Sequence, residues 1–407
     1  MLFTSTSTAS TTPPRLRGIV LGSSRAIGYS SEPYSNGLVQ QPQNSWWTYF
    51  CWAGPLLNVR NAGVRGDTVV QMQARLQADV LAYAPDVVFL ECGGANDIPT
   101  SATPADFALA LTTLQAMSAT MRAAGIDVIH TLEPGRPFMA LGDDYHARNV
   151  VAWLKAAGLT LLDFRPVLMD SQAGTYNRAW SDDGVHVNLT GAKVQAQYAL
   201  DWWEAHRPSY ERPPLTTSDT DTSNLLTYGT FSGASNSGAT PQGWTLVNVS
   251  AVGITAAIVD PIDTTTDPKV AGKLWKATVV AGTATGTLAI RQDVTLPVPV
   301  WWAPGDTILQ GFWVKAEGFE ATGVQYSIGV LYDGATNQHR PMNAWSQDFE
   351  GWVWVEGTVI PAGATNVKFF VTIDGLGGVL QQDAHLWVGM VTLFNATAQI
   401  GTRGGIL

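Results

Sequence analysis

The chain contains few charged residues and few cysteines, and its apolar runs are short. Only 14% of its 407 residues are charged, whereas an ordinary soluble domain is about 25% charged. A net charge of -10, with no basic stretch, argues against a nucleic-acid partner and against attraction to an anionic membrane. No apolar run approaches the roughly 18 residues of a membrane span, so we expect no membrane insertion.

Cys51 and Cys92 are too few for a disulfide framework or a thiolate zinc site, and we expect both to be small buried hydrophobic residues. No histidine shows metal-ligand spacing, so no metal or other cofactor is predicted. The Ser/Thr/Pro-rich start of the chain lacks the basic and apolar segments of a secretory signal. We therefore predict no signal peptide and a soluble protein, which is virion-associated or released by lysis if it leaves the cell.

Residues 17–207 alternate short apolar runs with amphipathic stretches, after a flexible arm at residues 1–16. The runs predict strands at residues 18–21, 56–59, 86–90, 127–130 and 159–163, and the stretches predict helices near residues 68–83, 104–124, 144–157 and 189–205. Thr103 and Asn188 are suitable N-caps for two of these helices. Such alternation predicts a parallel sheet with helices on both faces, whose ligands bind at the carboxyl ends of the strands.

The composition changes at residues 208–223, a Pro/Thr/Ser/Asp stretch that reads as a linker. Beyond it, in residues 224–396, alternating apolar runs are separated by Gly, Pro, Asn and Asp, which predicts an antiparallel β-sandwich. Residues 397–407 form a Gly-rich tail. The length, at about 150 residues per domain, allows this division.

Three predicted strands are followed by loops that could carry chemistry. After the first comes Gly22-Ser23-Ser24, where a serine hydroxyl could reach the carboxyl edge of the sheet, although serines after strands are more often helix caps. Gly63 follows the second strand, and Asn96 follows the third in Gly94-Ala95-Asn96-Asp97. A backbone N–H and a side-chain amide there could serve an oxyanion, or the loop could be an ordinary turn.

The most specific motif is Asp183-Gly184-Val185-His186, just before the last helix of the α/β region. An aspartate three residues before a histidine on a tight loop can accept the Nδ1 proton and leave Nε2 free as a base. His146 lies three residues after Asp143, but at the start of a predicted helix, so we expect it at the surface.

Together these blocks resemble the SGNH hydrolase (GDSL-like esterase) superfamily over residues 17–207. The resemblance implies a flavodoxin-like three-layer α/β/α domain that needs no cofactor. It also implies a nucleophile at Ser24, with His186 as base and Asp183 as the orienting acid. The implied oxyanion hole combines the Ser24 and Gly63 amides with the Asn96 side chain.

One residue departs from the family pattern. Ser23 stands where the family usually has aspartate, so the hydrogen bonds of that loop must be made differently, and Ser23 is itself a competing nucleophile. A degenerate copy of the fold that only binds is the alternative. Loss of catalysis is disfavoured because the chain retains all five residues to which the resemblance gives a role: Ser24, Gly63, Asn96, Asp183 and His186.

Residues 224–396 are similar to jelly-roll carbohydrate-binding modules, and they hold nine of the 16 tryptophans. Aromatic faces stack on sugar rings. Among these nine, Trp301, Trp302 and Trp345 stand in turn-rich contexts and are our candidates for sugar contact, whereas Trp313 and one of Trp352 and Trp354 are expected in the core.

An esterase joined to such a module predicts removal of O-acetyl or similar groups from an acylated polysaccharide or cell-surface glycan. The chain also looks like a phage tail or receptor-binding component that acts on a host glycan, and a homo-oligomer stays open. The alternative is a catalytically inactive glycan-binding or structural adhesion protein. A general lipase is a weaker third option.

Overall fold

A computed structural model describes residues 16–28, 44–53, 56–93, 96–98, 102–137, 140–207, 224–227, 229–232, 238, 240–262, 270–296, 302–319, 324–333, 338–380 and 382–395. Residues 1–15 of the predicted arm, the linker at 208–223 and the tail at 397–407 lie outside the described residues, and so does Trp301.

The first half of the chain forms a five-stranded parallel sheet in the order β2-β1-β3-β4-β5. Its strands are β1 (Arg17–Gly22), β2 (Leu57–Gly63), β3 (Val87–Glu91), β4 (Asp127–Leu132) and β5 (Thr160–Asp163). This is the flavodoxin-like strand order. The predicted α/β/α class is therefore confirmed, and the carboxyl ends of the strands meet at one edge of the sheet.

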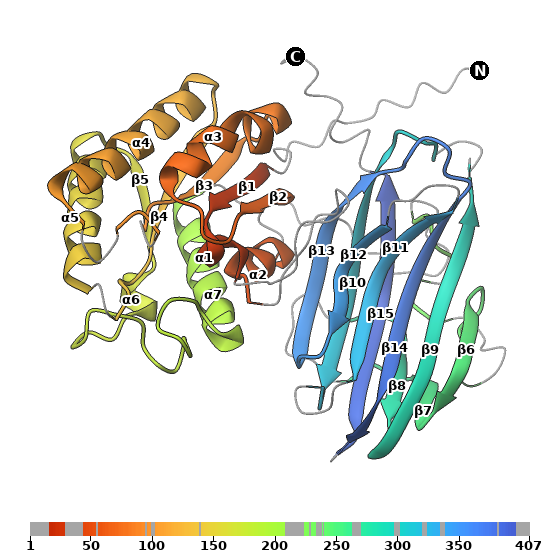
Figure 1. Cartoon of the computed structure of the whole chain (residues 1–407). Helices are drawn as coiled ribbons and strands as arrows, with labels where there is room; N and C mark the ends of the chain where they lie inside the picture. Colours follow the sequence, from red (N-terminus) through yellow and green to blue (C-terminus); the bar gives the residue numbers. More distant parts are fainter. Residues whose placement is uncertain are drawn as a thin grey trace, which may run out of the picture.

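Helices cover both faces of this sheet (Figure 1). They are α1 (Ser24–Ile27), α2 (Trp46–Trp52), α3 (Val69–Asp79), η1 (Leu81–Tyr83), α4 (Pro104–Ala123), α5 (Ala140–Ala156), α6 (Arg165–Leu168) and α7 (Leu189–His206). Alternate residues of β1 point to opposite layers, as the pleat requires. Val20 packs with the α2 and α7 layer, while Ile19 and Leu21 pack with α3, α4 and α5.

Local signals explain where the long helices begin. Thr103 is the N-cap of α4, with its backbone N–H donating to the Asp106 carboxylate at 2.7 Å. The Asn188 side chain accepts from the Gly191 amide at 2.9 Å and caps α7. Helix α2 was not predicted, because all seven of its residues are buried and the segment shows no polar face.

The second half forms two five-stranded sheets, with orders β13-β10-β15-β8-β7 and β12-β11-β14-β9-β6. The described strand pairs in both sheets are antiparallel, and apolar side chains from both sheets share one core. The strands are β6 (Thr245–Val252), β7 (Ile254–Val259), β8 (Leu274–Val279), β9 (Gly282–Thr295), β10 (Thr307–Glu317), β11 (Gln325–Asp333), β12 (Gln338–Trp345), β13 (Phe349–Val359), β14 (Asn366–Leu380) and β15 (Ala384–Asn395). The predicted all-β sandwich is confirmed. The likeness to carbohydrate-binding modules stays a prediction.

The sandwich lies beside α2 of the α/β domain (Figure 1). Aromatic side chains from the two domains form a cluster there. The Trp52 and Trp345 ring centroids lie 5.0 Å apart, and the Tyr49 ring stacks on Phe349 at 6.1 Å. Lys193 of α7 donates from Nζ to the backbone oxygen of Asp348, at 3.1 Å. Large buried rings of this kind dominate the energetics of interfaces.

The burial of two tryptophans corrects two of the predicted sugar contacts. Trp345 is 2% exposed and Trp302 is 5% exposed, so neither offers an open face to a ligand. Their turn-rich sequence contexts were misleading, because Trp345 is covered by α2 of the other domain and Trp302 lies in the apolar core. Trp313 and Trp352 are buried, as predicted.

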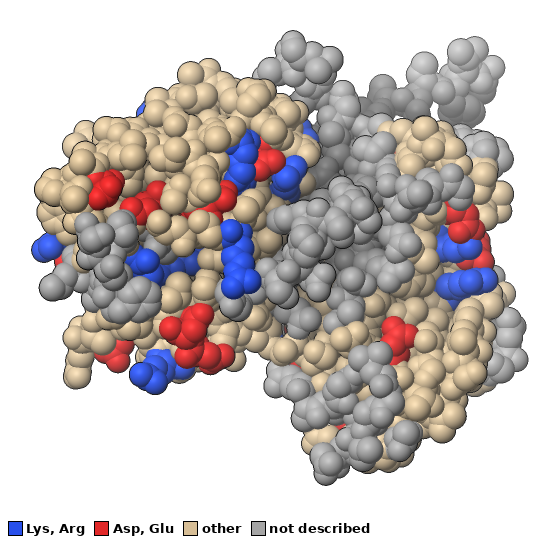
Figure 2. Space-filling model, in the orientation of Figure 1, with Lys and Arg blue, Asp and Glu red and all other residues tan. Residues whose placement is uncertain are grey.

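Charged side chains on the face shown in Figure 2 are sparse, and the two signs are interspersed among uncharged residues. Within the described ranges, no helix is long and apolar enough to cross a membrane.

Candidate active site

Ser24, His186 and Asp183 form a continuous hydrogen-bonded chain at the carboxyl edge of the sheet. Ser24 follows β1 as the first residue of α1, and its Oγ lies 2.9 Å from His186 Nε2. The other ring nitrogen, His186 Nδ1, lies 2.7 Å from Asp183 Oδ2. This order of hydroxyl, imidazole and carboxylate is the geometry that activates a serine for acyl transfer.

The loop that carries Asp183 and His186 is shaped by its own carboxylate. Asp183 Oδ1 accepts the backbone N–H groups of Val185 and His186, each at 2.8 Å. Partial burial raises the pKa of Asp183, but the hydrogen bonds from His186 and Val185 outweigh it and hold the pKa at about 2. Asp183 therefore stays ionised throughout the range in which a histidine titrates.

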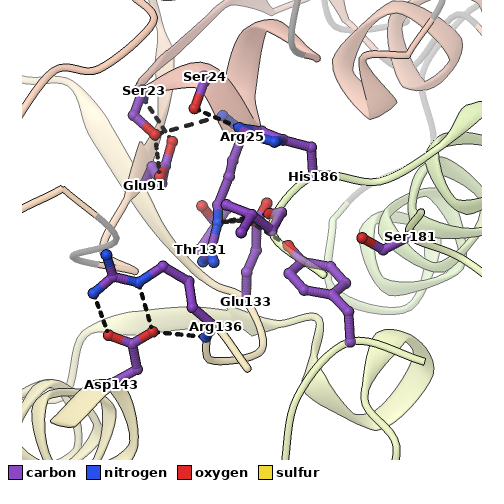
Figure 3. A network of polar contacts seen from close by, with 12 residues as sticks. Ser23, Ser24, Arg25, Glu91, Thr131, Glu133, Arg136, Asp143, Ser181 and His186 are labelled. Carbon is purple, nitrogen blue, oxygen red and sulfur yellow. Dashed lines mark hydrogen bonds and ion pairs between the residues drawn. The ribbon is translucent and has the colours of Figure 1, made fainter. Parts of the chain in front are cut away.

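Ser23 faces away from the imidazole. Its backbone N–H and its Oγ donate to the two oxygens of Glu91, each at 2.7 Å, and Ser23 is 1% exposed (Figure 3). Glu91 ends β3, and a side chain at Gly22 would collide with its Oε2 atom. Glu91 thus accepts hydrogen bonds that hold the loop at Ser23, the position where the family usually has aspartate. Its role was missed because it lies 68 residues from Ser23 in the sequence.

Glu91 is buried beside a second acid. Burial raises its pKa to about 7 and the nearby Glu133 carboxylate adds to the effect, while Arg25 and the hydrogen bonds from Ser23 oppose it. An acid that is about half protonated near neutral pH is unusual for a glutamate. The loop that presents Ser24 is therefore held by a group sensitive to pH.

A comparison with known protein families covers the segment that holds these residues. Residues 20–194 match the GDSL-like Lipase/Acylhydrolase family. The N-terminal part of the chain is a GDSL-like (SGNH) hydrolase domain. No curated protein matches the chain.

Solved structures similar to this hydrolase domain each cover just under half of the chain. A G-D-S-L family lipolytic protein from Desulfitobacterium hafniense is 21% identical, with a TM-score of 0.40, and covers 46% of this chain and 98% of its own. A catalytic mutant of an acetylxylan esterase from Geobacillus stearothermophilus is 16% identical, with a TM-score of 0.38, and covers 46% and 93%. A GDSL-like lipase from Bacteroides thetaiotaomicron is 19% identical, with a TM-score of 0.37, and covers 46% and 86%.

Two of the predicted oxyanion donors, Gly63 and Asn96, already have hydrogen-bond acceptors in the structure. The Gly63 amide already donates to Asn61 Oδ1 at 3.0 Å, so this structure does not support Gly63 as a donor. Asn96 is exposed, and its Nδ2 donates to the backbone oxygen of Asp67 at 2.9 Å. An amide nitrogen carries two hydrogens, so Asn96 keeps one for another acceptor.

Gly66 is a second glycine, in the segment that follows β2. On one side of Gly66, the Val64 amide donates to the backbone oxygen of Gly22 at 3.1 Å. On the other side, the backbone oxygen of Asp67 accepts from Asn96 Nδ2. Gly66 is exposed with φ +82°, and no acceptor among the described residues takes its amide. A left-handed backbone favours glycine, but the sequence alone does not show which of two loop glycines adopts it.

His146 corrects another prediction. It is fully buried, its Nε2 lies 3.1 Å from the backbone oxygen of Cys92, and burial lowers its pKa. Helix α5 begins at Ala140, four residues earlier than predicted, which places His146 in a later turn that faces inward. Cys51 and Cys92 are both buried, as predicted, and neither is part of a disulfide. Among the described residues, no cluster of His, Cys, Asp and Glu could hold a metal ion.

Proposed function

We propose that the chain is a serine esterase whose nucleophile is Ser24. The observation that carries this proposal is the unbroken chain from Ser24 Oγ through His186 to Asp183, at 2.9 and 2.7 Å. The His186 side chain is 15% exposed, so the imidazole is enclosed but still reaches solvent. Membership of the first domain in a GDSL-like hydrolase family supports the reaction class.

The mechanism follows from these groups. His186 removes the Ser24 proton while Oγ attacks the ester carbonyl, and Asp183 holds the ring tautomer and stabilises the imidazolium. We assign the oxyanion donors to the Ser24 amide, the remaining Asn96 hydrogen and the Gly66 amide. Each well-placed donor is worth about 10²–10³ in kcat. His186 then returns its proton to the leaving alcohol, and water cleaves the acyl-enzyme.

As substrate we propose O-acetyl groups on a polysaccharide or cell-surface glycan. This rests on the union of a hydrolase domain with a β-sandwich packed against it through Trp52 and Trp345. The low charge of both domains suits a neutral polymer. A place in a phage tail that acts on a host glycan, with or without homo-oligomerisation, is the wider setting we propose, and it rests on analogy with such assemblies.

Turnover of p-nitrophenyl acetate by purified variants tests the reaction class. S24A and H186A should each lose at least about 10³-fold in kcat, since each removes a proton-transfer partner. S23A is the matched control: it removes one hydrogen bond to Glu91 but leaves Ser24 and His186 intact, so measurable turnover should remain.

If S23A abolishes turnover and S24A does not, the nucleophile is misassigned. If the intact protein shows no turnover yet binds glycans, the chain is an inactive adhesion protein instead. Acetate release from a panel of acetylated polysaccharides then identifies the substrate. Release from none of them, with p-nitrophenyl acetate still cleaved, would reject the glycan proposal alone.

A further inference from the structure

Arg25 links the two loops that carry the proposed catalytic groups. It follows Ser24 in the chain, and its Nε donates to the backbone oxygen of Val185 at 3.1 Å. Val185 directly precedes His186. The Arg25 side chain, next to Ser24 at the start of α1, is therefore bonded to the backbone of the histidine loop (residues 181–188). Each end of this contact lies one residue away from a proposed catalytic group.

Buried neighbours fix the Arg25 guanidinium in place. Its Nε lies 3.5 Å from Glu133 Oε2, and its Cζ lies 5.4 Å from the centre of the Tyr176 ring. Glu133 is itself held by the Tyr176 hydroxyl at 2.9 Å and by Gln195 Nε2 at 3.0 Å. Arg25 is 3% exposed. Two groups therefore orient Arg25: Glu133, which directly follows β4, and the Tyr176 ring. Gln195 of α7 acts on Arg25 only through Glu133.

Stability alone is a poor explanation for this arginine. Burying an ion pair costs desolvation energy that its attraction often fails to return. The Arg25 Nη2 atom is buried without a partner among the described residues, which adds to that cost. A buried polar group that is incompletely satisfied calls for a functional explanation.

The histidine loop needs such a link because it is irregular. Residues 181–188 lie in no helix or strand, and the contacts from Asp183 to Val185 and His186 fix the internal shape of the loop but not its distance from Ser24. The contact between Arg25 and Val185 joins the two loops independently of the bond between Ser24 and His186. A displacement of about 1 Å between reacting groups can cost about 10² in rate.

We propose that Arg25 is a positioning residue that holds the histidine loop at bonding distance from Ser24. This inference rests on the proposed esterase function. Arg25 acts through the backbone of Val185 and does not contact the substrate. Its removal should therefore lower kcat and leave KM nearly unchanged.

The substitution R25K tests this directly. Lysine keeps the positive charge beside Glu133, but it has a methylene where arginine has Nε and so loses the donor to Val185. We expect kcat on p-nitrophenyl acetate to fall about 10–10²-fold, with KM changed less than about 3-fold. R165K is the matched control, because Arg165 also uses its Nε as a donor, here to the Asp163 carboxylate, but stands outside this network. It should keep kcat within about 3-fold.

A second measurement separates this inference from the proposed function. The low-field proton NMR signal of His186 Nδ1, identified by its loss in H186A, should shift or broaden in R25K and stay unchanged in R165K. This readout remains valid even if the wild-type protein has no esterase activity. If R25K does not fold, the double variant R25M/E133Q, which leaves neither partner as a lone charge, is compared with E133Q alone. Wild-type kcat or an unshifted signal in R25K, or equal kcat in R25M/E133Q and E133Q, would overturn the assignment.

Discussion

The buried acid behind the serine loop leads to a prediction about stability and pH. Glu91 is 3% exposed, and burial together with Glu133 raises its pKa from the ordinary 4.5 to about 7. A group whose folded pKa lies above its unfolded value contributes stability that is fully present below the unfolded pKa. That stability is lost as the pH rises through the folded pKa. For Glu91 the loss should therefore run from about pH 5 to about pH 8.

The substitution E91Q isolates this contribution. Glutamine has nearly the shape of the neutral acid and can still bond to Ser23, but it cannot ionise. Raising the pKa of Glu91 from 4.5 to about 7 on folding lowers the free energy of unfolding at high pH by on the order of 3 kcal/mol. Relative to the wild-type protein, E91Q should gain stability as the pH rises, by up to about 3 kcal/mol at pH 8.

Urea unfolding of both proteins at four pH values measures this difference. E204Q is the control, because Glu204 lies exposed on α7 and its substitution should give a curve parallel to the wild-type curve. Parallel curves for E91Q and the wild-type protein between pH 5 and pH 8 would refute the reasoning. A difference that grows as the pH falls would show that Glu91 is ionised more readily in the folded state.

Two further predictions concern Asp183, the acid of the proposed triad, and the domain interface. D183N should lower kcat by about 10³–10⁴-fold, because asparagine no longer fixes the His186 tautomer, and steady-state kinetics measures this. Since the pKa of Asp183 is about 2, protonation of this residue should not contribute to any loss of activity between pH 5 and pH 8. W345A should destabilise the protein by about 3–5 kcal/mol through loss of the buried ring against Trp52, measured by urea unfolding. Its kcat should stay within about 3-fold of wild type, and a large fall in kcat without a fall in stability would contradict this.

The fold and the contacts among Ser24, His186 and Asp183 could be predicted because their signals are local. Alternating apolar runs gave the five parallel strands, and Thr103 and Asn188 marked two helix starts. Asp183 and His186 are three residues apart, so their contact is built into one loop. Their meeting with Ser24 follows from the parallel sheet, which brings the ends of its strands to one edge.

The remaining features depend on contacts between distant segments. Ser23 and Glu91 pair across 68 residues, and Arg25 reaches Val185 across 160. Trp345 has the sequence context of an exposed turn, yet α2 of the other domain covers it. The identity of the glycine that offers a free amide depends on backbone angles at Gly66 and on the Asn61 contact at Gly63.

The covalent site of an acyl-enzyme mimic tests the central claim most directly. The intact protein is treated with a fluorophosphonate, which reacts only with an activated hydroxyl, and the modified peptide is located by mass spectrometry. The triad geometry predicts a single adduct on Ser24, formed in the wild-type protein and in S23A and absent in H186A. An adduct on Ser23, or equal labelling of the wild-type protein and H186A, would contradict it.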